Sequence, residues 1–207
     1  MGRINLSKNT PIDLKKKAPE LVRVGFGTGW EFKRNSFDLD IFAAATDEHK
    51  RYINKQSLCY FGRPSIFGGG IKVSPDNLTG KGKGVDEELT IDLAKLPPEV
   101  KEIYIGINIY RGEIRRQDFS QLSEAFLEIR NKQTNELIGE YDLDEMIGKK
   151  QACIIGKLIV TQNSLVFHPL LDTLNGNAIE KILSAYGLQK SQSQGSGGFL
   201  QNLFGRS

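Results

Sequence analysis

The sequence predicts a mainly β protein of the sandwich type with a short C-terminal helix. Short apolar or alternating segments recur along the chain, and clusters of glycine, proline or asparagine separate most of them. One segment has the period of an amphipathic helix. With 207 residues, of which 39% are hydrophobic, the chain is long enough to form one substantial core.

Nine segments have the pattern of β-strands. In the segment 102–110, isoleucines at alternate positions share one face of the strand, and we expect that face to point into the core. The nine predicted strands cover residues 21–26, 37–45, 57–61, 89–93, 102–110, 125–130, 137–143, 153–161 and 164–167.

The predicted helix begins near Asn177, which can cap it together with Glu180, and it ends at Gly187. Its apolar residues fall on one face, which can pack on a sheet. These residues are Ile179, Ile182, Leu183 and Tyr186.

We expect one folded domain over residues 1–187, a flexible linker over 188–198 and a short amphipathic tail over 199–207. The linker is rich in glutamine, serine and glycine, which bury too little apolar surface to offset the entropy of the chain. The tail predicts either a frayed terminus or a docking peptide for a protein partner or a membrane surface. Its apolar residues are Phe199, Leu200, Leu203 and Phe204.

The composition excludes several functional classes. The formal charge of +3 arises from 28 basic and 25 acidic residues, so no nucleic-acid partner is expected. Cys59 and Cys153 lack a paired spacing, which predicts buried free thiols in a reducing compartment. No transmembrane segment or signal peptide is visible, so we expect a cytoplasmic protein. No nucleophile elbow or catalytic histidine pattern is present, and we expect no enzyme.

The first candidate site is the segment Phe-Asp-Leu-Asp-Ile at residues 37–41. If the segment is a strand, its apolar residues face the core, and Asp38 and Asp40 lie together on the opposite face. Two neighbouring carboxylates repel each other, so they either lie in open solvent or hold a cation between them. The spacing alone leaves both alternatives open.

The second candidate site is the acidic, glycine-rich segment 74–88. Glycines at positions 80, 82 and 84 let the backbone turn its carbonyl oxygens inward, and acids at both ends supply carboxylates. Calcium binds such a mixture of oxygens. The spacing is not that of an EF-hand, because the third and fifth positions counted from Asp76 are Leu78 and Gly80.

Two alternatives stand beside calcium for this segment. One is a phosphate- or nucleotide-binding protein or enzyme that uses the loop Gly80–Gly84 with Lys81 and Lys83. The P-loop pattern is absent, because Lys83 is followed by glycine and then by acids that repel a phosphate. The other alternative is a solvated acidic hairpin.

Six short motifs occur in a fixed order between about residue 4 and residue 186. They are Leu-Ser-Lys at 6–8, Gly-x-Gly-Trp at 27–30, Phe-Asp-Leu-Asp at 37–40, Asp-Asn-Leu-Thr-Gly-x-Gly-x-Gly-x-Asp-Glu at 76–87, Gln-x-Phe at 117–119 and Tyr-Asp-Leu at 141–143. In these motifs the chain resembles the TerD family of tellurium-resistance and stress-response proteins.

The resemblance implies a two-sheet β-sandwich that binds calcium in its acidic loops and has no established catalytic activity. It also implies a role in the response to tellurite or other chemical stress, through other stress-response proteins as partners. The calcium ligands that it implies are Asp38, Asp40, Asp76, the carbonyl oxygens of Asn77, Leu78 and Gly82, and the acids Asp86, Glu87 and Glu88.

The chain departs from the family pattern after the isoleucine-rich strand. The family typically continues there with a histidine-aspartate or similar acidic turn that contributes to a second site or completes the first. This chain has Ile-Tyr-Arg-Gly-Glu at 109–113. Arg111 brings a cation to this position, and Glu113 is left as the one oxygen donor for a second calcium.

Overall fold

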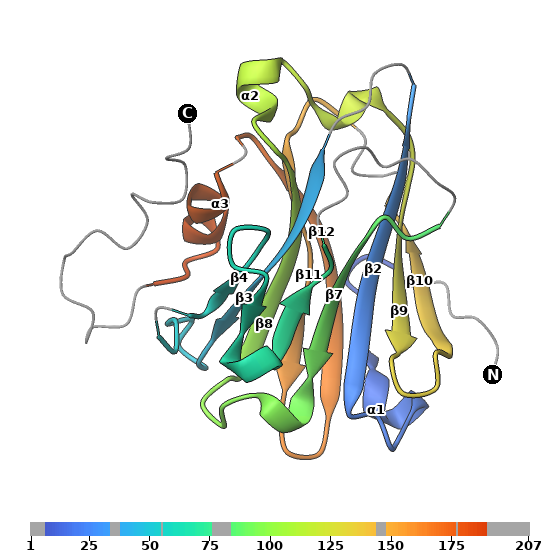
Figure 1. Cartoon of the computed structure of the whole chain (residues 1–207), viewed down its shortest axis with the longest axis vertical. Coiled ribbons are helices and arrows are strands. Elements are labelled where there is room, and N and C mark those ends of the chain that lie inside the picture. Colours follow the sequence, from blue (N-terminus) through green and yellow to red (C-terminus); the bar gives the residue numbers. More distant parts are fainter. Residues whose placement is uncertain are drawn as a thin grey trace.

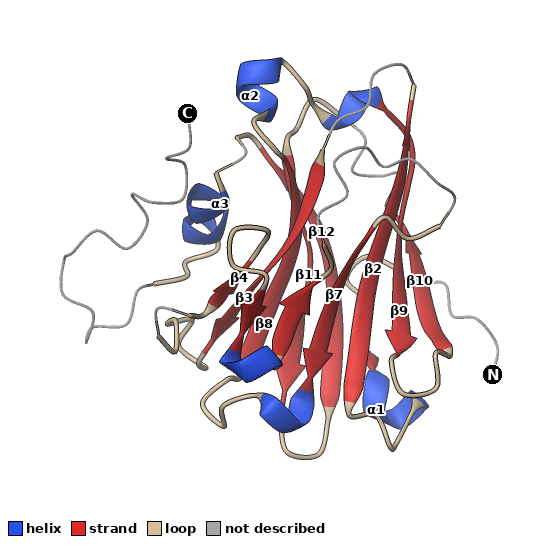
Figure 2. Cartoon of the chain, viewed as in Figure 1, coloured by secondary structure: helices blue, strands red, loops and turns tan. Residues whose placement is uncertain are grey.

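The computed structural model of the protein describes residues 7–33, 38–54, 56–75, 84–143, 148–176 and 178–189. Two sheets of six strands face each other, and all strand pairs are antiparallel (Figures 1 and 2). The predicted two-sheet β-sandwich is therefore confirmed.

The first sheet, called the β8 sheet, has the isoleucine-rich strand near its middle. Its strands, in spatial order, are β1 (Ile12–Asp13), β12 (Leu165–Leu174), β11 (Ala152–Val160), β8 (Glu102–Ile109), β3 (Leu39–Thr46) and β4 (Leu58–Cys59).

The second sheet is called the β2 sheet. Its strands, in spatial order, are β10 (Leu137–Asp142), β9 (Leu122–Asn131), β2 (Arg23–Phe32), β7 (Glu87–Asp92), β6 (Ile71–Val73) and β5 (Ser65–Ile66). All nine predicted strands occur in the two sheets. The sequence did not predict β1, β5 and β6, because two or three residues are too few to show an alternation.

Short helices lie between the strands, and one of them follows the last strand. They are the α-helices α1 (Leu14–Lys17), α2 (Gly112–Arg115) and α3 (Ile179–Ala185), and the 3₁₀-helices η1 (Phe67–Gly69), η2 (Leu93–Lys95) and η3 (Phe119–Gln121). Within the described residues, no helix is long and apolar enough to span a membrane.

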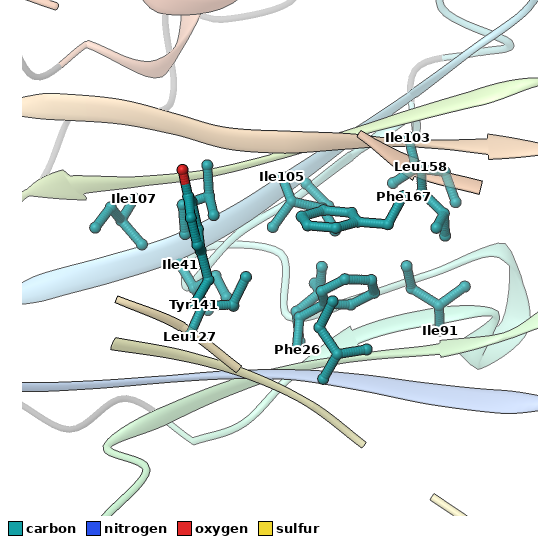
Figure 3. Close-up of a cluster of buried hydrophobic side chains, with 14 of the residues drawn as sticks. Phe26, Ile41, Ile91, Ile103, Ile105, Ile107, Leu127, Tyr141, Leu158 and Phe167 are labelled. Atoms are coloured by element: carbon teal, nitrogen blue, oxygen red, sulfur yellow. The ribbon is translucent and has the colours of Figure 1, made fainter. Parts of the chain in front are cut away.

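The main core fills the space between the sheets. The alternate isoleucines of β8 point into it, as predicted, and the rings of Phe26 and Phe167 meet across it with their centroids 5.3 Å apart (Figure 3). Trp30 and the free thiol of Cys59 are also buried in this core. Burial of this apolar surface from both sheets is the main contribution to stability.

A second apolar cluster covers the outer face of the β8 sheet. Phe42, Tyr104 and Ile154 lie on that face, and the predicted apolar side of α3 packs onto them. The position that caps α3 is Ala178, which makes no side-chain capping hydrogen bond. The predicted cap, Asn177, lies outside the described residues. Gly187 follows the helix with a positive φ of 75°, as expected for a glycine at a helix end.

The folded chain continues beyond the expected boundary at residue 187. Leu188 is buried in the second cluster, and the backbone of Gln189 exchanges hydrogen bonds of 2.9 Å with Lys50 and Tyr52. The first two residues of the expected linker therefore pack on the domain. The tail 199–207 lies outside the described residues.

Candidate metal centre

Asp38 and Asp40 lie where β3 begins. Only 6% and 2% of their surfaces are exposed. Leu39 and Ile41 point into the core between the sheets, whereas Phe42 belongs to the cluster on the outer face of the β8 sheet. The alternation therefore places the two aspartates on that outer face, as predicted. The alternative of open solvent is wrong, because both carboxyl groups are buried.

Glu87 joins the β2 sheet to the β8 sheet. It opens β7 on the same face as Leu89, which belongs to the core between the sheets, and 5% of its surface is exposed. Its Oε2 atom accepts a hydrogen bond of 2.7 Å from the backbone N–H of Ile41 in β3. Since β4 pairs with β3 only at Ala43 and Ala44, the carboxylate occupies an edge of β3 that β4 does not reach.

Asp86 performs a similar role inside the β2 sheet. Its Oδ2 atom accepts a hydrogen bond of 3.0 Å from the backbone N–H of Trp30, which lies beyond the last residue of β2 that pairs with β7. Burial raises the pKa of Asp86 above its ordinary value, the Trp30 N–H opposes this rise, and the charge of Glu31 adds to it. A nearby cation would favour the charged form.

The glycines of β2 explain how the loop before Asp86 reaches the sheet. A Cβ atom on Gly29 would lie 2.3 Å from the carbonyl oxygen of Gly84, and one on Gly27 would lie 2.8 Å from the side chain of Val85. The backbone that leads into Asp86 can therefore lie across β2 only because these side chains are absent. The alternate glycines are a sequence signal for this contact that the sequence analysis did not use.

Glu88 lies on the opposite face of β7 from Glu87. Its carboxylate forms an ion pair of 3.0 Å with Lys132 and also accepts a hydrogen bond from Thr90. The structure therefore separates this predicted ligand from the buried carboxylates. Its partner Lys132, in the turn after β9, was not predicted because the pairing of β2 with β7 and β9 sets the contact.

The turn after β8 contains Arg111 and Glu113, where the sequence departs from the family pattern. The guanidinium carbon of Arg111 lies 5.3 Å from the centre of the Tyr110 ring, so this cation stacks on an aromatic side chain. Glu113 is exposed, and its Oε1 atom lies beside Gly176. The structure thus places Glu113 next to the end of β12.

Asp38, Asp40, Asp86 and Glu87 lie at one end of the sandwich, where β3 and β7 begin and β2 ends (upper end in Figure 1). We call this the acidic end. Among the described residues, no three acidic, histidine or cysteine side chains are close enough together to hold a metal ion. The other predicted ligands Asp76, Asn77, Leu78 and Gly82 lie outside the described residues, as do Lys81 and Lys83 of the alternative phosphate site.

Comparison with models of protein families identifies the family of this chain. The model of the TerD domain matches residues 2–186. The chain belongs to the TerD domain family.

Relatives in the TerD family have names that refer to stress and to tellurium. The chain is 32% identical over 190 residues to general stress protein 16U of Bacillus subtilis (strain 168), which covers 90% of this chain and 98% of that protein. It is 28% identical over 191 residues to tellurium resistance protein TerD of Serratia marcescens, which covers 91% of this chain and 99% of that protein. The family is thus one of tellurium resistance and stress response.

A solved structure has the same fold. It is a homologue of telluride resistance protein (TerD) from Streptomyces coelicolor A3(2), with a TM-score of 0.62 and 20% sequence identity. The superposition covers 77% of this chain and 94% of that chain. At this identity the likeness supports the TerD-type sandwich and nothing beyond the fold.

Proposed function

We propose that this protein binds one calcium ion at its acidic end and acts, without catalysis of its own, in the response to tellurite or other chemical stress through protein partners. The family supplies the stress response, and the geometry of the acidic end supports the calcium. The observation that carries the proposal is the burial of Asp38, Asp40 and Glu87 at one end of the sandwich.

Buried carboxylates require compensation. Transfer of a charged group from water to a protein interior is strongly unfavourable unless hydrogen bonds or a positive charge offset it. A divalent cation provides that charge and also needs several oxygen ligands. The described carboxylates do not form a complete metal site by themselves. In the proposal they supply part of the oxygen ligands, and the loop before β7 supplies the others.

The donor set favours calcium over other metals. Among the described residues, neither free cysteine belongs to a group of metal-binding side chains. The candidate ligands are carboxylate and carbonyl oxygens, which suit hard cations. Magnesium prefers a strict octahedron with several waters, whereas calcium accepts a larger and more flexible set of protein oxygens. Calcium is therefore the best match.

We assign seven ligand residues to the calcium. They come from the start of β3, from the loop before β7 and from the start of β7. Glu88 is omitted, because it pairs with Lys132 on the other face of β7. The assigned residues are Asp38, Asp40, Asp76, Asn77, Leu78, Gly82 and Glu87, and Asp86 supports them from the neighbouring position.

Calcium at this position would connect the two sheets. Glu87 already bonds β7 to β3, and a shared cation would add a second link between the strand and the loop. Metal binding then stabilises the folded state and fixes the surface of the loop. Partner proteins would recognise that fixed surface.

Calorimetric titration of the metal-stripped full chain tests the proposal. We expect calcium to bind with a stoichiometry of one, to remain bound in excess magnesium, and to lose at least about tenfold in affinity in Asp40→Asn, which removes one charge with little change in shape. Glu99→Gln removes an exposed charge near the opposite end and should bind as the wild type does.

Two results would count against calcium. One is an absence of calcium heat together with an absence of thermal stabilisation. The other is binding of inorganic phosphate that is lost in Lys81→Gln/Lys83→Gln, which would favour the phosphate site in the glycine-rich loop. A stoichiometry of two would indicate a second calcium, for which Glu113 is the candidate ligand.

A further inference from the structure

A basic turn with an apolar tip protrudes beside the acidic end. It comprises residues 111–116, which include α2, and it lies between β8 and β9 at the upper end of the molecule (Figure 1). Ile114 is 82% exposed, about twice the exposed fraction of Val22 or Val85, the two other exposed large hydrophobic residues among those described. The three exposed arginines of the turn are Arg111, Arg115 and Arg116.

The backbone of this turn is held in place by hydrogen bonds. The N–H of Gln117 bonds the carbonyl of Gly112 at 2.8 Å, and the N–H of Arg115 bonds that of Arg111 at 3.0 Å. Gly112 is buried, and a Cβ atom there would lie 3.1 Å from the carbonyl oxygen of Gln117. The turn therefore presents Ile114 on a fixed backbone.

Both ends of the turn have an uncommon conformation. Arg111 and Arg116 adopt φ values of 53° and 54°, in the left-handed region that side chains other than glycine rarely occupy. Such conformations persist where the surroundings impose them, and they often occur at functional positions. Here they turn the chain out of β8 and back towards β9, so that Ile114 is at the tip.

The arginines are arranged around one aromatic side chain. The guanidinium carbons of Arg111 and Arg115 lie 5.3 Å and 5.5 Å from the centre of the Tyr110 ring, and that ring packs edge-on against Phe61 at 5.4 Å. Within the described part of the chain, neither Arg115 nor Arg116 forms an ion pair. Stacking fixes the positive groups close to the exposed isoleucine.

We propose that the basic turn docks on an anionic lipid bilayer. Ile114 would enter the boundary between headgroups and acyl chains, and the arginines would bind lipid phosphates, which match the planar guanidinium group. A single convex apolar residue fits a deformable surface, whereas a protein partner would need a pocket of matching shape. One isoleucine and a net charge of +2, from three arginines and Glu113, provide a weak and reversible attachment. The proposal does not depend on bound calcium.

Vesicle flotation of the full chain tests this docking. We expect the protein to float with vesicles of equal parts phosphatidylglycerol and phosphatidylcholine, and not with vesicles of phosphatidylcholine alone. The double variant Ile114→Ser/Arg115→Gln should lower the partition coefficient by about tenfold. The chain offers a matched control in Val22→Ser/Arg23→Gln, which removes an exposed apolar residue and one positive charge at the opposite end.

Further experiments distinguish membrane binding by the basic turn from membrane binding through calcium or through the C-terminal tail. Binding should persist in a chelator of calcium and should persist in a chain that ends at Lys190, which lacks the apolar residues of the tail. The proposal is overturned if the wild type binds neither vesicle, if both double variants bind equally well, or if removal of the tail alone abolishes binding. Equal folding of both double variants is verified by their thermal unfolding.

Discussion

The two ends of the sandwich satisfy their free backbone groups with different side chains. At the acidic end, the carboxylates of Asp86 and Glu87 accept hydrogen bonds from backbone N–H groups of β2 and β3. At the opposite end, the neutral amide oxygen of Gln133 accepts hydrogen bonds of 2.6 Å and 3.2 Å from the N–H groups of Val22 and Arg23. A neutral acceptor is therefore sufficient for this kind of contact.

The opposite end also contains a partly buried carboxylate, and its partners there are a lysine and a tyrosine. There, Glu102 accepts a hydrogen bond of 2.7 Å from the Lys157 ammonium group and another of 2.7 Å from the Tyr104 hydroxyl. Hydrogen bonding of the backbone does not by itself require an acid at position 87. Under the proposed function, the carboxylate of Glu87 would also bind the cation.

The largest expected effect comes from removal of that charge. Glu87→Gln keeps an acceptor for the Ile41 N–H but weakens the proposed calcium site. At a calcium concentration of about 100 times Kd, the wild type should gain about 2.7 kcal/mol, or roughly 8 °C in Tm, and the variant should gain little. Thermal unfolding with calcium and with a chelator measures both values.

The control for this prediction is the reciprocal change at the opposite end. Gln133→Glu introduces a carboxylate where the wild type has an amide, and it should leave the calcium-dependent gain in Tm intact. An equal gain in the wild type and in Glu87→Gln would show that Glu87 serves only the hydrogen bond to β3.

The second prediction concerns the backbone contact that positions Asp86. In Gly29→Ala, the new methyl group would meet the carbonyl oxygen of Gly84, so the strand or the loop must move. We expect a loss of about 2 kcal/mol in the free energy of unfolding and a weaker affinity for calcium. Chemical denaturation and calorimetric titration measure the two effects.

Gly25→Ala is the matched control on the same strand and the same face. Its methyl group would meet Cδ of Lys132 at 2.7 Å, and this flexible side chain can move aside. The free energy of unfolding should therefore change by less than about 1 kcal/mol. If both variants lose the same stability and both retain calcium affinity, the position of the loop on β2 has no special importance.

Most of the fold could be predicted from local patterns. The alternate isoleucines of β8 and the apolar face of α3 identified the two faces of the β8 sheet, because burial on one side is a property of each element alone. The cap of α3 was less predictable. Ala178 occupies the cap position, and tertiary packing of the helix outweighs the capping preference.

The candidate site was predicted only in part, because contacts between strands decide it. Neighbouring acids in the sequence suggested that Glu87 and Glu88 act together, yet the period of two in a strand sends them to opposite faces. The burial of Asp38 depends on the strands beside it, since the N–H of Tyr110 bonds its carbonyl at 2.9 Å. Such pairings between distant segments leave no local pattern.

The smallest expected effect tests internal compensation at the opposite end. Burial raises the pKa of Glu102. The hydrogen bonds from Lys157 and Tyr104 and the charge of Lys157 lower it by a larger amount, so the pKa lies below its ordinary value. Glu102 therefore contributes stability above its ordinary pKa and loses this contribution as pH falls through the lowered pKa. Lys157→Met should reduce the free energy of unfolding at neutral pH by about 1 kcal/mol.

The difference between the wild type and Lys157→Met should shrink as the pH falls and Glu102 becomes protonated. Urea denaturation at several pH values measures it, with Lys101→Met as the control, because the Lys101 ammonium group bonds the carbonyl of Pro98. Calcium should not change the difference, since Glu102 lies at the opposite end from the proposed site. A calcium-dependent difference would mean that the two ends are coupled, and the charge at the acidic end could then no longer be explained separately.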